Sequence, residues 1–308
     1  IREITLTGNT FDLSSLTGFD VSKARNWQGG TVSGSTLTVD ENAAVVTYSY
    51  DTGCTKTGLE NVVFTLAIAG RGTDIAIDAA NFPDPKFREF LLSPEVNIDR
   101  NRDSKLSTWE IALVRELDIY GEDIRDLTGI GYFTELEILS CVSTHLTSLD
   151  LSQNTRLTVL DASHNDLTSL DLRQNTGLIE LDVKYNDLTR LDLRRNTGLT
   201  KLDVSNNNLT SLDLSQNTNL TELEAEGNAC TIAPVDGRFH LASLPSGFDA
   251  GKAENWQGGT VSDNILTINS DAKQVTYEYD CGNGHTAVFT LEIPTQYTVT
   301  AHGLYGGV

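Results

Sequence analysis

The most regular feature of the chain is a run of leucines between residues 136 and 228. Each unit reads L-x-x-L-D-L-x-x-N, as in "LTSLDLSQN" at 146–154. The first leucine of successive units falls at Leu136, Leu146, Leu157, Leu167, Leu178, Leu188, Leu199, Leu209 and Leu220. Because the spacing alternates between 10 and 11 residues, the true period is 21 residues.

Within each unit, apolar and polar positions alternate with the period of two that is typical of a β-strand. Leu149 and Leu151 are predicted to face inward, and Asp150 to face outward. One unit cannot bury its own leucines, but stacked units bury a continuous core in which each leucine contributes about 1.5–3 kcal/mol. Because both half-units carry this pattern, we expect a parallel β solenoid with two narrow sheets on opposite sides.

An asparagine closes each unit. We expect these side chains to turn inward and to satisfy backbone groups at the bend. The column comprises Asn154, Asn165, Asn175, Asn186, Asn196, Asn207, Asn217 and Asn228.

This period and spacing resemble the leucine-rich repeat, in the short bacterial variant built from nested units of 10 and 11 residues. Proteins with such repeats include bacterial surface proteins that are internalin-like in a broad sense. The resemblance implies recognition of a protein or glycan through the exposed strand faces.

The repeat also generates two outward columns of acidic residues. One column holds Asp150, Asp171, Asp192 and Asp213, and the other holds Asp161, Asp182, Asp203 and Glu224. Neighbours within a column are expected about 4.8 Å apart, where repulsion between two charges costs about 1 kcal/mol in water. Two interpretations stay open, a solvated face with local hydrogen bonds and a face that binds a cation or a basic ligand.

Exposed positions beside the aspartates vary, whereas the inward positions do not. Arg190 and Arg194 flank one aspartate, and Tyr185 is nearly the only aromatic residue on the repeats. Variation on a regular face is typical of a recognition surface, and neutral drift produces it equally. The low aromatic content favours the alternative of a structural spacer.

A helical cap is expected in front of the repeats, since an open solenoid end exposes apolar edges. The segments "DPKFREFLL" (84–92) and "TWEIALVREL" (108–117) both read as amphipathic helices, the first stopped by Ser93-Pro94. Between them, "DRNRDSKLSTWE" (99–110) resembles the calcium loop of EF-hand and dockerin proteins at every position but one.

The loop resemblance implies a structural calcium ion that clamps the two helices. Ser104 replaces the glycine of the sharp turn, which costs up to about 1 kcal/mol if a positive φ is required there. The alternative is an Asp-rich helix N-cap without a metal. The ligands implied are the side-chain oxygens of Asp99, Asn101, Asp103, Ser107 and Glu110, and the backbone carbonyl of Lys105.

Two further segments, 18–51 and 247–280, nearly duplicate each other. Their runs rich in Val, Thr and Tyr are separated by Gly-Gly and Asn/Asp/Ser turns, so each is predicted to be a small antiparallel β module. Trp27 and Trp256 in the shared "NWQGGTVS" either anchor the core or stack on sugar rings.

The predicted fold class is mixed and mainly β, with a leucine-rich-repeat solenoid, a helical N-terminal cap and two flanking β modules. "IREITLTGN" (1–9) aligns with "LTELEAEGN" (220–228), so both ends look cut from a longer tandem protein. The predicted division is a preceding repeat array ending at 1–10, β module 1 at 11–69, a linker at 70–83, the cap at 84–126, the repeats at 127–232, β module 2 at 233–294 and the start of another module at 295–308.

Four cysteines are too few for a disulfide scaffold of this size. Cys141 occupies a leucine-like position and is predicted to be a buried thiol. Cys230 and Cys281 could pair where the solenoid meets β module 2, and Cys54 has no obvious partner.

The net charge of −21 argues against nucleic acid or an anionic membrane as a partner, since each phosphate contact needs a Lys or Arg. No apolar stretch approaches the roughly 18 residues that span a bilayer. The five histidines are scattered and form no catalytic motif, so an enzyme is the least favoured class. The sequence therefore predicts a monomeric, extracellular or cell-surface module, braced by calcium, that binds an unknown protein or glycan; the alternative is a spacer that displays other domains.

Overall fold

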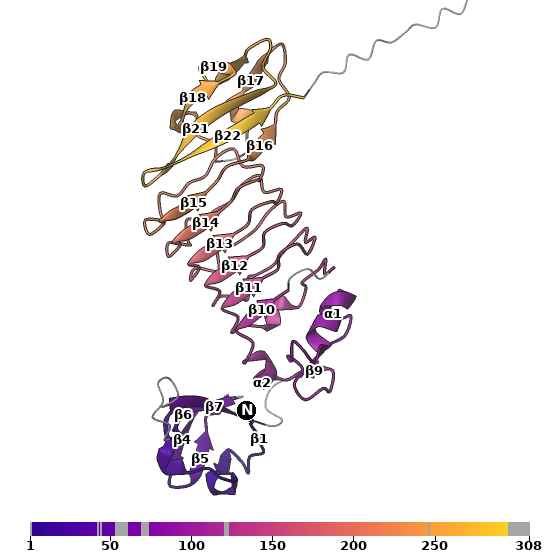
Figure 1. Cartoon of the computed structure of the whole chain (residues 1–308), viewed down its shortest axis with the longest axis vertical. Coiled ribbons are helices and arrows are strands. Elements are labelled where there is room, and N and C mark those ends of the chain that lie inside the picture. The colour runs from indigo at the N-terminus through magenta and orange to yellow at the C-terminus, as the bar shows by residue number, and fades with distance from the viewer. Residues whose placement is uncertain are drawn as a thin grey trace, which may run out of the picture. The chain divides into compact units, whose positions relative to one another are not determined.

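The computed structural model describes residues 2–41, 43, 45–52, 61–68, 74–119, 123–245 and 247–294. The chain divides into two compact units, one made of 1–117 and 126–137 and the other of 118–125 and 138–308. The fold is mainly β, with few helices and a parallel leucine-rich-repeat solenoid, which confirms the predicted fold class (Figure 1).

A parallel sheet follows one side of the solenoid (Figure 1). Leu160, Leu181 and Leu202 pair in register at its centre and are at most 2% exposed, as the alternating pattern predicts. In the order of the sheet, the strands are β10 (Glu116–Asp118), β11 (Ile138–Ser140), β12 (Val159–Asp161), β13 (Glu180–Asp182), β14 (Lys201–Asp203) and β15 (Glu222–Glu224).

The predicted second sheet, on the opposite side of the solenoid, does not form in the described residues. Segments 148–152 and 169–173 contain no strand, and no backbone hydrogen bond joins them. The carboxylate of Asp150 accepts the N–H of Ser152 at 2.9 Å, but Asp161 accepts the N–H of Ser163 in the same way beside a strand, so this bond does not account for the missing sheet.

Asparagine side chains connect the turns on this side. The amide of Asn175 donates to the carbonyls of Leu151 and Asn154 in the preceding turn, at 3.0 and 2.9 Å. The amide of Asn196 makes the same contacts one repeat later. All eight asparagines of the column are buried, which confirms their predicted inward orientation.

Each β module contains two small sheets. In β module 1 they are β1-β7-β6-β3 and β2-β5-β4, and in β module 2 they are β16-β22-β21-β18 and β17-β20-β19. The strands of β module 1 are β1 (Arg2–Ile4), β2 (Thr10–Asp12), β3 (Ala24–Gln28), β4 (Gly30–Ser33), β5 (Thr36–Val39), β6 (Val45–Asp51) and β7 (Asn61–Ile68), with short helices η1 (Leu13–Ser15) and η2 (Val21–Lys23). Those of β module 2 are β16 (Asn228–Thr231), β17 (Arg238–His240), β18 (Ala253–Gln257), β19 (Gly259–Ser262), β20 (Ile265–Ile268), β21 (Gln274–Gly282) and β22 (His285–Glu292), with η4 (Leu241–Ser243) and η5 (Ala250–Lys252).

The sheet register aligns the two copies more closely than the sequence does. β1 pairs in parallel with β7, with Arg2 opposite Leu66, and β16 pairs in parallel with β22, with Cys230 opposite Leu291. Since Leu66 and Leu291 hold the same place in the duplicated strands, residues 2–4 correspond to 230–232. They lie in the sheet of β module 1, whereas the sequence alignment matched them to the last repeat. The segment 295–308 lies outside the described residues.

The cap contains one of the two predicted helices in full. Helix α1 (Pro85–Leu92) begins at Asp84, whose carboxylate accepts the N–H groups of Lys86 and Phe87. The prediction of a second helix over 108–117 is wrong, because α2 (Thr108–Ile111) makes a single turn before β10. The cap also contains β8 (Ile75–Ala76), β9 (Lys105–Leu106) and η3 (Ile130–Tyr132).

The early end of α2 follows from the burial pattern after it. Leu117 and Ile119 are buried at a spacing of two, as in a strand, and the N–H of Ile119 donates to the carbonyl of Ser140. A helix over the same residues would lose this pairing and turn one of the two side chains to water.

Candidate functional site

One acidic column lies on the exposed face of the solenoid sheet. Asp161, Asp182 and Asp203 are direct register partners in β12, β13 and β14, and Glu224 continues the row. Strand spacing sets neighbouring side chains about 4.8 Å apart. All three aspartates are half-buried, so they are less solvated than ordinary surface carboxylates.

Local hydrogen bonds and one lysine hold this column together. The N–H groups of Ser163, Lys184 and Ser205 donate to the aspartate two residues before each of them, at 3.0–3.1 Å. The Nζ atom of Lys184 lies 2.6 Å from Asp182 Oδ2 and 3.4 Å from Asp203 Oδ2. A single cation thus bridges two of the three carboxylates.

Burial raises the pKa of Asp182, and the neighbouring charges of Asp161 and Asp203 raise it further, although hydrogen bonds from Lys184 act in the opposite direction. The hydrogen bond to Asp182 raises the pKa of Lys184 in turn. Because the folded-state pKa of Asp182 exceeds its unfolded value, ionisation of this group at neutral pH destabilises the fold. This destabilisation disappears as the pH falls through the raised pKa, because the Asp182 side chain then becomes neutral.

We therefore expect Asp182→Asn to leave the free energy of unfolding at pH 7 within about 0.5 kcal/mol of the wild type, or to raise it slightly. The measurement is urea unfolding at pH 7 and pH 4. Asp203→Asn serves as a matched control in the same column. A loss of more than about 2 kcal/mol at pH 7 in Asp182→Asn alone would show that the carboxylate stabilises the fold.

An exposed aromatic pair lies three residues beyond this column. The rings of His164 and Tyr185 stack with centroids 4.4 Å apart and planes at 16°, and Tyr185 is 49% exposed. Both residues have a positive φ, of 56° and 53°. A non-glycine residue in this conformation costs about 1 kcal/mol, so exposing the two rings at this turn lowers the stability of the fold.

The stacking of His164 on Tyr185 was not predicted from the sequence. The signal was their separation of one full period, since positions 21 residues apart lie side by side in the stack. The same turn position holds Ser143, His164, Tyr185, Asn206 and Gly227, all with positive φ.

The other acidic column lies on the opposite side of the solenoid, and two of its four aspartates pair with arginines. Arg173 forms a two-pronged contact with Asp171, and Arg194 forms the same contact with Asp192, with shortest distances of 2.6 and 2.7 Å. Hydrogen bonds from these arginines lower the pKa of each aspartate to about 2. Asp150 and Asp213 are held by the N–H and hydroxyl of a serine two residues on, which lowers the pKa of both.

The structure thus divides the predicted binding residues between two sides of the solenoid. Asp161, Asp182, Asp203 and Tyr185 gather on the sheet side. The opposite side carries Asp150, Asp171, Asp192, Asp213, Arg190 and Arg194.

The EF-hand-like loop is organised around the buried carboxylate of Glu110. Its Oε1 accepts the N–H groups of Arg100 and Asn101 at 2.8 and 3.2 Å. Its Oε2 accepts the N–H and hydroxyl of Ser107 at 2.9 and 2.7 Å, which completes a capping box for α2. Glu110 therefore binds the backbone of its own loop with both oxygens.

The remaining predicted ligands form a chain of turns. Asp99 accepts the N–H groups of Asp103 and Ser104, at 3.2 and 2.9 Å, and Asp103 accepts the N–H of Lys105 at 2.9 Å. The donor set consists of oxygen atoms, as calcium requires. Within the described residues, no group of three or more His, Cys, Asp or Glu side chains is placed to hold a metal ion.

Ser104 has φ = 61°, at the position where the motif has its glycine. We expect Ser104→Gly to raise the free energy of unfolding of the cap by about 0.5–1 kcal/mol, because glycine adopts this φ without steric cost. Thermal unfolding in excess chelator measures the effect. Ser93→Gly, at φ −64°, is the control and should destabilise; equal shifts in the two variants would contradict the strain at Ser104.

The described cysteines are free thiols, so Cys230 and Cys281 are not bridged. Cys281 Sγ lies 3.6 Å from the carbonyl of Tyr279, and its burial raises its pKa to about 12. Cys141 is fully buried, as predicted. Cys54 lies outside the described residues.

Trp27 and Trp256 stack on Tyr48 and Tyr277, at 4.6 and 4.5 Å between ring centroids. Both indoles are half-buried, which supports the interpretation that they anchor the module cores.

Comparison with known proteins finds similarity only among solved structures. The chain is similar to an internalin, inlF, of Listeria monocytogenes (24% identity over 52% of this chain and 48% of that chain, TM-score 0.47) and to a leucine-rich-repeat protein of Leptospira interrogans (26% identity over 42% and 36%, TM-score 0.37). A third similar structure is a plant ice-binding protein (24% identity over 35% and 46%, TM-score 0.26). The chain therefore spans less than half the length of each of these three structures.

No family model matches the chain, and no curated protein does. Within the described residues, no helix is long and apolar enough to cross a membrane.

Proposed function

We propose that the solenoid is a protein-recognition module of a bacterial surface or secreted protein, and that it binds a basic partner through the exposed face of its parallel sheet. The observation that carries this proposal is the half-buried row of Asp161, Asp182 and Asp203 beside an exposed aromatic pair. Lys184 is the cation that bridges this row.

The electrostatics of the sheet face support the choice of partner. Asp182 stays in a position where burial and two like charges oppose its ionisation. Such a group lowers the stability of the unbound protein. Because Asp182 and Asp203 share one lysine, the row keeps a net negative charge that a cationic ligand would neutralise. On the opposite side, Asp171 and Asp192 each have an arginine of their own, so a cationic ligand would gain less there.

The aromatic pair supplies the anchor that an acidic row lacks. Stacked rings add apolar area with little loss of side-chain freedom, and tyrosine is enriched among residues that dominate binding energies. Tyr185 and His164 are the described aromatic residues at this turn, and they lie in the same two repeats as Asp182 and Asp161.

The test is selection of binders from a displayed library of extracellular proteins on the immobilised full chain. Each clone is then measured against the double variant Asp182→Asn/Tyr185→Ser. We expect its affinity to fall by about tenfold or more, and wild-type binding to weaken as salt rises. The matched control, Asp171→Asn/Arg173→Gln on the opposite side, should bind like the wild type.

Clones that bind both double variants as tightly as the wild type would overturn the sheet face as the site. Selection of no clone above background would favour the alternative function, a structural spacer. A parallel glycan array distinguishes a sugar ligand, which the same face would bind with little dependence on salt.

We further propose that the loop at 99–110 binds calcium as a structural ion. Its oxygen-rich donor set and the positive φ at Ser104 support this, and binding requires Glu110 to exchange at least one N–H partner for the ion. The probe is terbium, whose luminescence would be sensitised by Trp109 inside the loop. We expect saturable luminescence that calcium displaces and that Asp103→Ala abolishes; equal luminescence in Glu95→Ala and Asp103→Ala would contradict the site.

A further inference from the structure

β module 2 covers the C-terminal end of the solenoid, and both lie in one compact unit. The hydroxyl of Tyr277 donates a hydrogen bond of 2.6 Å to the carbonyl of Thr210. The N–H of Leu214 donates to the carbonyl of Cys281 at 2.7 Å. As a result, Thr210 and Leu214 in the last turn are at most 1% exposed.

β module 1 carries the same aromatic set in the same places. Tyr48 pairs with Phe64 across the sheet, as Tyr277 pairs with Phe289. The ring of Phe19 packs edge-on against Tyr48 at 5.4 Å, as Phe248 does against Tyr277 at 5.6 Å. The side chains that cover the solenoid end in one module therefore have counterparts in the other.

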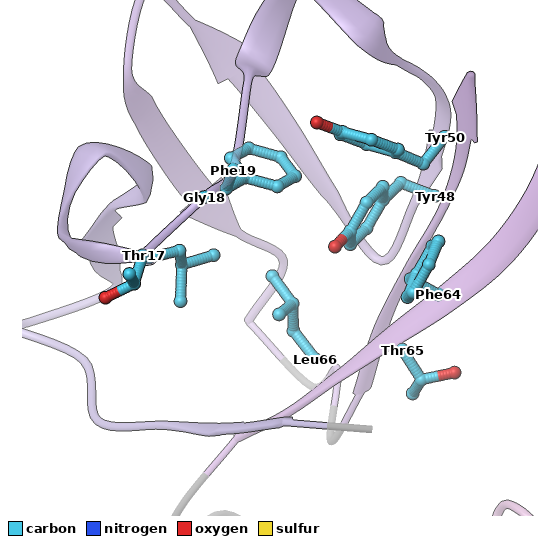
Figure 2. Close-up of a pocket in the computed structure, with 9 residues that line it drawn as sticks. Thr17, Gly18, Phe19, Tyr48, Tyr50, Phe64, Thr65 and Leu66 are labelled. Carbon is cyan, nitrogen blue, oxygen red and sulfur yellow. The ribbon is translucent and has the colours of Figure 1, made fainter. Parts of the chain in front are cut away.

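In β module 1 this face is an open pocket of about 330 Å³ (Figure 2). Figure 2 shows the rings of Phe19, Tyr48, Tyr50 and Phe64 gathered around it, with Leu66 beside them. The lining is largely apolar and aromatic, which is typical of a surface that is covered in the functional state.

The two modules differ in the exposure of the aromatic side chain that faces the pocket. Phe64 is 39% exposed, whereas its counterpart Phe289 is fully buried. The preceding residues, Val63 and Val288, point to the other face of the strand and are 68% and 52% exposed. The larger difference in side-chain exposure therefore lies on the strand face that contacts the solenoid turn in β module 2.

We propose that the pocket of β module 1 is a docking face for the end turn of a second leucine-rich-repeat solenoid. The occupant is a turn equivalent to 210–215, with a backbone carbonyl aimed at Tyr48 and a buried leucine. This inference concerns a surface separate from the proposed ligand-binding face of the sheet.

The strand register supports this occupant over an unrelated partner. Asn228, the last asparagine of the solenoid, leads directly into β16, which adds to β22 in parallel. β1 adds to β7 in the same way, with residues 2–4 in the places of 230–232. A repeat array joined at residue 1 would therefore reach the pocket without any linker.

The test is an extended chain in which a copy of residues 74–228 is fused directly in front of residue 1 of the full chain. We expect amide exchange in 45–50 and 61–68 to slow by about tenfold or more relative to the native chain, because the pocket becomes covered. We also expect Phe64→Ser to lower the Tm of the extended chain by about 4 °C more than that of the native chain.

Val63→Ser is the matched control and should shift the Tm equally in both chains. Unchanged exchange in 45–50 and 61–68, or equal effects of Phe64→Ser in the two chains, would overturn the proposal. Failure of the added repeats to fold in front of β module 1 would do the same, since identical repeats fold in front of β module 2. Concentration-dependent dimerisation of the native chain that Phe64→Ser abolishes would assign the pocket to a second copy instead.

Discussion

Asn207→Ala is expected to lower the free energy of unfolding of the solenoid by about 3–5 kcal/mol. The Asn207 side chain is buried, and its amide donates to the carbonyls of Val183 and Val204 at 2.9 and 3.2 Å. Its Oδ1 accepts the N–H of Leu188 at 3.0 Å. Alanine leaves these backbone groups buried without a partner and opens a cavity between two turns. Urea unfolding followed by circular dichroism measures the loss.

The neighbouring Asn208 provides the matched control. It is half-buried, and its side-chain amide donates to the carboxylate of Asp187 at 3.3 Å. Asn208→Ala should cost about 0.5 kcal/mol or less. Because each repeat contacts its neighbours alone, amide exchange in Asn207→Ala should quicken first near residue 188. Equal losses in the two variants would contradict the role assigned to the inward asparagines.

Glu110→Gln is expected to lower the stability of the cap by about 2–4 kcal/mol even in excess chelator. The carboxylate is fully buried, and both its oxygens accept hydrogen bonds from the loop backbone or from Ser107. An amide keeps one acceptor oxygen and turns a donor toward N–H groups, so at least two bonds are lost. Thermal unfolding with and without calcium measures the effect.

The measurement in chelator separates two roles of Glu110, as a calcium ligand and as the hydrogen-bond acceptor that caps α2. If the side chain acted only as a calcium ligand, the variant and the wild type would melt together in chelator, and this outcome would contradict its role in capping α2. Glu89→Ala, which removes an exposed pair with Lys86 at 2.7 Å, should change the Tm by less than about 2 °C and controls for loss of surface charge.

Prediction from sequence worked best where one residue type repeats in one environment. The leucine period fixed the strands of the solenoid, and the asparagine column was correctly placed inside, since a buried backbone needs partners at every turn. The predicted second sheet was wrong, because both half-units carry the same L-D-L pattern and only one of them pairs its backbone with the next turn. The carboxylate bond to the N–H two residues on does not distinguish the two half-units, since it occurs in both.

The candidate site was predicted in part. The two acidic columns were placed outward on opposite sides, but the stacking of Tyr185 on His164 and the arginine pairs of one column were not predicted. The pocket of β module 1 was missed, since Phe19, Tyr48 and Phe64 are read as core residues in any β module. The calcium loop and the absence of catalysis stay predictions.

The sequence by itself determined the repeat period, the parallel solenoid, the duplication of the β modules and the N-cap of α1. These follow from local pattern, because burial of leucine and pairing of backbone groups recur with every turn. Only the tertiary structure decided where α2 stops and which module face is covered. Each of these depends on a contact between residues far apart in the chain, such as that of Tyr277 with Thr210, and no local pattern encodes its partner.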